Sequence, residues 1–157
     1  MPLYYDGPEA YETLFGDLTQ RSLRTLKAEH LDLSVTICDD ETIRPLNEQW
    51  RGVDSATDVL SFPQLNIEPN APLPESVAGG PPTSLGDIVI SEQTALRQAD
   101  TLGHSLEREF AVLFVHGLCH LLGHSHKGDE DAQAMATLEN LVLCDSGGLV
   151  ARSGVLQ

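Results

Sequence analysis

Four of the six histidines of the chain lie within one short segment, HGLCHLLGHSH at positions 116–126. This segment directly follows the apolar run FAVLFV, which is typical of a buried helix. His116 and His120 are four residues apart, so on a helix their side chains project from one face, about 6 Å apart along the axis. That spacing places two imidazoles where they can share a metal ion.

A third ligand requires the helix to end. If the helix continued, His124 would extend the same row, and three rings stacked along one line cannot converge on one tetrahedral ion. Gly123 can adopt a positive φ, end the helix and let the chain turn back, so that His126 approaches the ion from another direction. We therefore predict that His116, His120 and His126 bind one zinc ion at the C-terminal end of this helix. Three imidazoles with an open fourth position are typical of a catalytic zinc site.

The alternative is that these histidines are ordinary core or surface residues. A lone histidine in an apolar helix is more often a core residue than a metal ligand, but the number and spacing here favour the metal. Three imidazoles also suit nickel, copper or iron, so the sequence does not fix the ion. His124 is assigned to the surroundings of the site or to the surface, and His30 and His104 are assigned to the surface.

The histidine pair resembles the H-E-x-x-H motif of metalloproteases, but Gly117 stands where those enzymes have glutamate. That glutamate is their general base, so its absence disfavours peptide hydrolysis unless another carboxylate reaches the site. A zinc ion would still lower the pKa of a water molecule and polarise a scissile oxygen. Such chemistry suits the cleavage of a phosphodiester.

Size and charge restrict the class of protein further. With 157 residues, of which 41% are hydrophobic, the chain fits one domain over residues 1–157 that buries its own core. It carries 24 acidic and 9 basic residues, a formal charge of −15, which disfavours non-specific binding to nucleic acid or to anionic membranes. We therefore expect neither DNA nor a membrane as a partner.

No targeting signal is visible. No window approaches the roughly 18 to 20 consecutive apolar residues that span a bilayer, and the first residues lack a basic region followed by an apolar stretch. The three cysteines are odd in number and far apart, which excludes a disulfide framework and a C-x-x-C zinc motif. We expect a cytoplasmic protein.

Hydrophobic periodicity and capping residues divide the chain into helices, short strands and one long loop. The expected helices cover residues 9–29, 39–50, 91–103, 105–123 and 128–143, and the expected strands cover residues 31–38, 57–63 and 85–91. Pro45 is compatible with the second helix only if it lies in the first turn. This order predicts an α+β fold, a small mixed sheet with helices packed on it.

Residues 64–84 contain five prolines and two glycines, so we expect a long surface loop there. A loop of this length inside a small domain is usually functional or disordered.

Three blocks of the sequence resemble the YbeY family, the bacterial single-strand-specific endoribonucleases of ribosomal RNA maturation and ribosome quality control. HGLCHLLGHSH closely resembles the family signature H-G-x-x-H-L-x-G-x-D-H. LNEQWRGVDSATDVLSFP (46–63) and LGDIVIS (85–91) match further blocks in the right order. With the last helix, in which Met135 and Glu139 lie, the resemblance covers about residues 30–143.

The resemblance implies a metal-hydrolase-like α+β fold and the same three zinc ligands. It places a functionally important arginine at Arg51, whose guanidinium can fork onto phosphate oxygens and stabilise the charge that grows during cleavage. A surface salt bridge is the alternative for Arg51. Asp58 and Asp87 lie in the matched blocks. Their positions fit a role in the site and a role in capping or turn formation equally well. Residues 64–84 are longer than the family core needs, which makes them a candidate flap over the cleft.

One position departs from the family signature. Ser125 stands where the family has aspartate, directly before the last histidine. Outer-shell partners of this kind affect metal affinity by about 10 to 100-fold, so we expect a looser or differently tuned site.

By resemblance, the chain is a zinc-dependent endoribonuclease that processes the 3′ end of 16S rRNA and serves ribosome quality control. Its substrate is an rRNA precursor on the ribosome, with protein partners among ribosomal proteins and GTPases. Because the chain is acidic, RNA must be held by the metal, Arg51 and neighbours such as Arg44 or Arg97, after delivery by a ribosome or partner. Two alternatives remain open, a metallopeptidase-like hydrolase and a non-catalytic, zinc-containing ribosome-associated factor with a closed four-ligand site.

Overall fold

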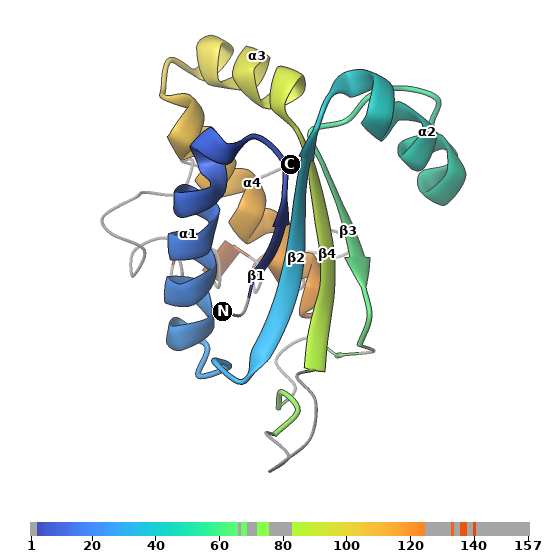
Figure 1. Ribbon diagram of the computed structural model, residues 1–157. Coiled ribbons are helices and arrows are strands. Elements are labelled where there is room, and N and C mark those ends of the chain that lie inside the picture. The colour runs from blue at the N-terminus through green and yellow to red at the C-terminus, as the bar shows by residue number, and fades with distance from the viewer. Residues whose placement is uncertain are drawn as a thin grey trace.

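The computed structural model describes residues 3–65, 67–68, 72–75 and 83–124, together with Gln133, Ala136, Thr137 and Asn140. Its strands are β1 (Leu3–Asp6), β2 (Leu31–Cys38), β3 (Val59–Pro63) and β4 (Thr83–Ser91). Its helices are α1 (Glu12–Thr25), preceded by the 3-10 turn η1 (Glu9–Tyr11), α2 (Asp40–Arg51), α3 (Glu92–Leu102) and α4 (Leu106–Leu121). The α+β class is as expected (Figure 1).

The four strands form one mixed sheet in the order β1-β2-β4-β3. β2 is parallel to both β1 and β4, whereas β3 runs antiparallel to β4 along an edge of the sheet. In this register Val35 lies beside Ile88, and Val59 lies beside Ile90. The sequence did not predict β1, a four-residue edge strand whose pairing partner lies about 30 positions further along the chain.

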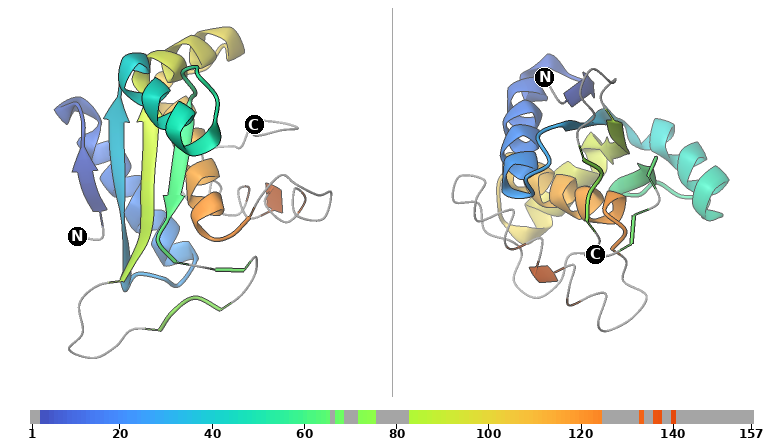
Figure 2. Two further views of the ribbon diagram at one scale, coloured as in Figure 1. Left: turned by 90° about the vertical axis from the view of Figure 1, so that its right-hand side faces the viewer. Right: turned by 90° about the horizontal axis from the view of Figure 1, so that it is seen from below.

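Helices cover both faces of the sheet, but unequally. α1 and α4 pack on one face (Figures 1 and 2). In the main core there, the ring of Phe15 contacts those of Phe110 and Phe114. α2 covers the other face, where Ile43 packs with buried residues of β3 and β4. Every residue of α4 from Glu109 to Cys119 is buried, so this helix is held from all sides. Cys119 packs in the core.

Capping residues set the ends of the helices that lead to the histidines. The side chain of Ser91 accepts a hydrogen bond from the Thr94 backbone N–H at the start of α3, and Ser105 accepts one from Arg108 at the start of α4. Gly103, with φ +71°, ends α3 in the left-handed conformation. These boundaries confirm the prediction. α1, however, ends at Thr25 rather than at residue 29.

Pro45 lies in the interior of α2 and not in its first turn, so that expectation was wrong. Proline lacks the N–H that would otherwise donate to the carbonyl of Glu41. Both residues are exposed, so water can hydrate that carbonyl. The ends of α2 are well fixed, because Asp39 accepts a hydrogen bond of 2.8 Å from the Thr42 N–H and Gly52 closes the helix with φ +72°.

Asp40 joins the first turn of α2 to the first turn of α3. Its carboxylate accepts hydrogen bonds from Ser91 Oγ and Thr94 Oγ1, both 2.6 Å, and from Arg97 Nη2 at 2.8 Å. Partial burial raises the pKa of this carboxyl, but the three hydrogen bonds outweigh that effect and hold the pKa below its ordinary value of 3.8.

We expect Asp40→Asn to lower the free energy of unfolding by about 2 kcal/mol at pH 7, because it removes a charge-assisted hydrogen bond to Arg97. The folded pKa of Asp40 is depressed, so its stabilising effect is complete above pH 3.8 and is lost as the pH falls through the folded value. Denaturant unfolding at several pH values should therefore show the gap between wild type and variant closing in acid. A gap that widened on acidification would contradict this assignment.

The described residues between Gln64 and Glu75 form neither helix nor strand, as expected, but β4 begins at Thr83, inside the predicted loop. In the expected last helix, 128–143, only Gln133, Ala136, Thr137 and Asn140 are described, and they are helical. Met135 and Glu139 lie outside the described residues. Within the described part of the chain, no helix has the length and apolar character needed to cross a bilayer.

Candidate metal and RNA site

The last turns of α4 bring His116 and His120 together. Their ring centroids are 4.7 Å apart with the rings at 76° to each other, and the two Nε2 atoms are separated by 3.2 Å. His116 is buried and His120 is half-buried, so the pair lies at the boundary between the core and the surface. The two rings are neighbours on one face of α4, as the four-residue spacing predicted, and metal binding by them stays a prediction.

This geometry can be tested against a zinc ion. A tetrahedral ion with Zn–N bonds of about 2.0 to 2.1 Å holds any two of its nitrogen ligands about 3.3 Å apart. The observed Nε2–Nε2 separation of 3.2 Å agrees with that value. The separation of the two nitrogens is therefore compatible with one shared zinc ion.

The backbone at the end of α4 orients His120. His120 Nδ1 donates a hydrogen bond of 2.9 Å to the carbonyl oxygen of His124, which leaves the lone pair of a neutral ring on Nε2, the atom that faces His116. Metal-binding histidines commonly donate their other N–H to a carbonyl in this way. His124 is itself buried, so it belongs to the surroundings of the site and not to the surface.

Gly123 ends α4 as predicted. Its φ is +94°, its N–H donates to the carbonyl of His120, and the N–H of His124 donates to the carbonyl of Cys119. This is the paired hydrogen-bond pattern of a Schellman motif, in which a left-handed residue turns the chain off the helix axis. A side chain at Gly123 would meet the backbone oxygen of Ile67 at 2.0 Å. Only glycine fits this turn.

The third predicted ligand, His126, lies outside the described residues, as does Ser125. Within residues 3–124 as far as they are described, no three His, Cys, Asp or Glu side chains are grouped to hold a metal. The predicted zinc site therefore needs a ligand from outside the described residues in addition to His116 and His120, and His126 remains the prediction for it.

Gly117 faces the sheet and not the histidine pair. A Cβ atom there would lie 2.9 Å from Ile88 Cγ2 and 3.1 Å from Ser61 Oγ, and that hydroxyl donates to the carbonyl of Gly117 at 3.2 Å. The glycine lets α4 approach β3 and β4 closely. A glutamate at this position would be driven into the sheet, so the motif is not a protease motif with its base removed.

Arg51 is exposed at the C-terminal end of α2. Among the described residues it makes no ion pair, so the alternative of a surface salt bridge finds no support there. The neighbouring Trp50 is 62% exposed and contacts Phe62 of β3 edge-to-face.

The other arginines suggested for RNA binding are already paired. Arg44 binds Asp54 and Arg97 binds Asp40, each at 2.8 Å. Each guanidinium keeps further N–H donors besides the one that contacts the carboxylate, but the neighbouring negative charge weakens its attraction for phosphate. A role of these two arginines in RNA binding stays a prediction.

Asp58 and Asp87 make structural contacts. Asp58 accepts hydrogen bonds from the Val59 N–H at 2.8 Å and from Gln98 Nε2 at 3.1 Å, which joins β3 to α3. Asp87 accepts from Ser34 Oγ at 2.5 Å and from Gln64 Nε2 at 3.1 Å. Asp87 lies within β4, so it neither caps a helix nor forms a turn, and both aspartates link neighbouring elements instead. A role of either one in the site stays a prediction.

His30 and His104 are not ordinary surface residues, contrary to expectation. His104 Nε2 lies 2.7 Å from the carboxylate of Glu109, which is fully buried in the first turns of α4. A buried carboxylate needs such a partner. The ring of His30 is hydrogen-bonded to the carbonyl of Pro74, which fastens the long loop to the start of β2. Glu109, an acidic residue beside the apolar run, was a signal for the contact with His104. No signal in the sequence pointed to the contact of His30 with Pro74.

Comparisons with known proteins agree on one family. The family model described as Endoribonuclease YbeY matches residues 6–147. A protein of Pelotomaculum thermopropionicum named Endoribonuclease YbeY is 46% identical over 136 residues, which are 84% of this chain and 86% of the relative. Another of the same name, from Levilactobacillus brevis, is 40% identical over 151 residues, 92% of this chain and 93% of the relative.

A solved structure supports the fold. The solution structure of a Thermotoga maritima protein matches with a TM-score of 0.57 and covers 98% of this chain and 99% of its own. At 20% sequence identity, this likeness concerns the architecture alone.

Proposed function

The chain belongs to the YbeY endoribonuclease family and is a hydrolase that acts on phosphodiester bonds, and on that premise we propose that it is a zinc-dependent endoribonuclease specific for single-stranded RNA. Its substrate is a ribosomal RNA precursor, which it cleaves at the 3′ end of 16S rRNA. Its cellular roles are rRNA maturation and ribosome quality control. The observation that carries the metal dependence is the 3.2 Å separation of the His116 and His120 Nε2 atoms.

His116, His120 and His126 would hold the zinc ion. When bound there, zinc supplies Lewis acidity and lowers the pKa of a water molecule. The chain's own contribution is to fix the ligands beforehand. The His124 carbonyl holds the ring of His120, burial within α4 holds His116, and the glycine turn at Gly123 takes the chain off the axis of α4.

Arg51 would contact the scissile phosphate. Its guanidinium is exposed and unpaired within the described part of the chain, so it can bind phosphate oxygens without first breaking an ion pair. A forked guanidinium stabilises the negative charge that develops on phosphate oxygens during cleavage. With a formal charge of −15, the chain has little general attraction for RNA, so the ribosome or a partner protein would deliver the substrate. Ribosomal proteins and GTPases are the candidate partners.

Two other functions are less well supported. A metallopeptidase needs a general base, and the position that supplies it in H-E-x-x-H proteins is here a glycine packed against Ile88. A non-catalytic zinc factor would require a fourth protein ligand. His124 is buried and lines a pocket that neither His116 nor His120 lines, so its ring offers no support for a fourth ligand.

The role of Arg51 can be tested apart from zinc binding. We expect Arg51→Ala to lower kcat/KM for single-stranded RNA by about 100-fold, because one preorganised donor to the developing charge is lost. Zinc content and melting temperature should remain at wild-type values, since Arg51 is exposed and lies on α2. Arg51→Lys should recover only part of the rate, because lysine keeps the charge but not the fork. Arg24→Ala, which removes an exposed charge from α1, is the matched control. Wild-type kinetics of Arg51→Ala would remove this residue from the proposed mechanism.

A further inference from the structure

We propose that a pocket beside the histidine pair binds one unpaired nucleobase of the RNA, next to the scissile bond. This inference rests on the proposed function and adds to it a physical origin for single-strand specificity. The pocket has a volume of about 460 Å³, within the range of about 300 to 1,000 Å³ that is usual for small-ligand sites.

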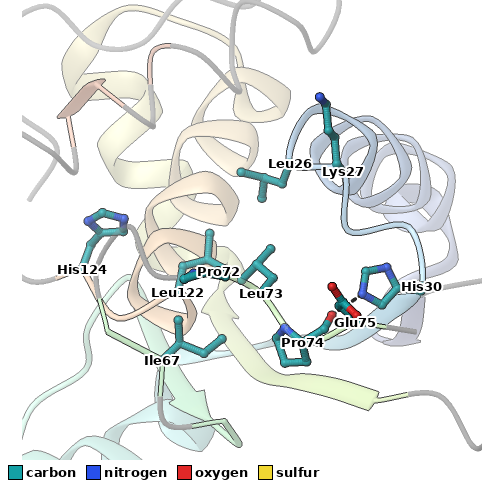
Figure 3. A pocket seen from close by; sticks show the side chains of 10 residues that line it. All are labelled: Leu26, Lys27, His30, Ile67, Pro72, Leu73, Pro74, Glu75, Leu122 and His124. Atoms are coloured by element: carbon teal, nitrogen blue, oxygen red, sulfur yellow. Dashed lines mark hydrogen bonds between the residues drawn. The ribbon is translucent and has the colours of Figure 1, made fainter. Parts of the chain in front are cut away.

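Apolar side chains form the middle of the pocket. Leu26 at the end of α1, Leu122 at the end of α4, and Ile67 and Leu73 of the long loop line it (Figure 3). A nucleobase has two apolar faces and a polar edge, so walls of this kind can enclose its faces. The carboxylate of Glu75, on the same rim, can accept hydrogen bonds from base N–H groups.

The pocket and the predicted metal site have the residue His124 in common. His124 lies at one end of it, and the carbonyl of the same residue accepts the hydrogen bond from His120 (Figure 3). The loop backbone at Ile67 lies directly against Gly123, where there is no room for a side chain. A base held in this pocket would therefore belong to a nucleotide close to the bond that is cut.

Lys27 lies on the side of the pocket formed by the end of α1, and its backbone is strained (Figure 3). Its φ of +55° makes it the only non-glycine residue with a positive φ in the described part of the chain. Its N–H donates to the carbonyl of Arg24, and the N–H of Ala28 donates to that of Leu23, so Lys27 occupies the turn position that usually holds glycine. A strained residue of this kind suggests that its side chain has a use.

The side chain of Lys27 offers the cation that a nucleotide needs. It is exposed at the rim and makes no ion pair with any described residue. The His30 ring, hydrogen-bonded to the Pro74 carbonyl, holds the loop beside it. Lys27 would bind the phosphate of the nucleotide whose base fills the pocket. In a chain with a charge of −15, such a local cation is the kind of site that RNA binding requires.

This pocket would distinguish single strands from duplexes. A base within a duplex must be unstacked and unpaired before it can enter a protein pocket, at a cost of a few kcal/mol, whereas an unpaired base enters without that cost. The preference for single-stranded RNA would then arise from one base and not from general affinity for the backbone.

Abasic scanning tests the proposal. The binding of zinc-loaded protein to nuclease-resistant 2′-O-methyl RNA of about ten nucleotides is measured by fluorescence anisotropy, with one base removed at each position in turn. One position near the cleavage site should lose about tenfold in affinity, and the others should change little. The Leu73→Trp variant fills the pocket with a larger side chain. It should bind RNA that has all its bases as weakly as the wild type binds RNA that lacks the base at the sensitive position. For this variant, removal of that base should have no further effect.

Lys27→Gly provides a second test that does not depend on filling the pocket. It should raise the melting temperature, because glycine relieves the left-handed strain, and yet weaken RNA binding several-fold. It should also reduce the slope of log K against log salt by about one, unlike Arg24→Ala. Three results would overturn the proposal that this pocket binds a base. They are an equal loss of affinity at all abasic positions, no measurable binding, and wild-type affinity in both pocket variants. Failure of the wild-type protein to cleave unmodified RNA of the same sequence would instead overturn the proposed function.

Discussion

His116→Ala and His120→Ala are each expected to remove the bound zinc and to abolish cleavage of single-stranded RNA. Loss of an outer-shell partner of a metal already costs about 10 to 100-fold, so the loss of a ligand should exceed 100-fold in kcat/KM. The reason is geometric, because the two Nε2 atoms lie 3.2 Å apart, which is close to the separation that two nitrogen ligands of one zinc ion would have. Metal content by elemental analysis and cleavage of a labelled RNA measure the two effects together.

The double variant is the internal control. Two residues that act only through one ion should not have additive effects, so His116→Ala combined with His120→Ala should be no less active than either single variant. Circular dichroism must show that all three proteins are folded, since both side chains lie at the end of a buried helix. Full cleavage by a protein verified to be free of metal would refute the metal-dependent function.

Gly117→Glu, which would create the H-E-x-x-H sequence, is expected to prevent folding and not to create a peptidase. A Cβ atom at this position already lies 2.9 Å from Ile88 Cγ2, inside the contact between α4 and the sheet. A longer side chain would overpack that contact and bury a charge, which together should cost more than about 4 kcal/mol of the free energy of unfolding. Thermal and denaturant unfolding would measure the loss.

Gly117→Ala separates the effect of volume from that of charge. Its single added methyl group must displace Ile88 or Ser61 slightly, which should cost about 1 to 3 kcal/mol and leave the protein folded. A Gly117→Glu protein with wild-type stability and chelator-sensitive peptidase activity would reverse our reading of this glycine. It would also restore the metallopeptidase as a competing function.

The sequence predicted correctly those features of the site that depend on neighbouring residues. The serine caps, the apolar run before His116 and the glycine at 123 fix the start, the burial and the end of α4 from neighbouring residues alone. The four-residue spacing then fixes the relation between His116 and His120, because a helix has only one geometry.

The sequence was less informative where a contact joins distant segments. Arg97 looked available for phosphate, but Asp40 binds it across 57 positions, and His30 is held by Pro74 across 44. β1 was missed because four residues carry no periodic signal, and its strand character depends on β2. The orientation of Gly117 toward Ile88 likewise depends on how α4 packs on the sheet, which spacing within the helix does not determine.

The central claim is that three imidazoles hold one ion and leave a position open. Zinc K-edge X-ray absorption of the purified protein measures this directly. We predict one zinc per chain, three imidazole nitrogens and a single oxygen, all at about 2.0 to 2.1 Å. A thiolate at about 2.3 Å, a fourth imidazole, or a protein that binds no zinc at all would contradict the account.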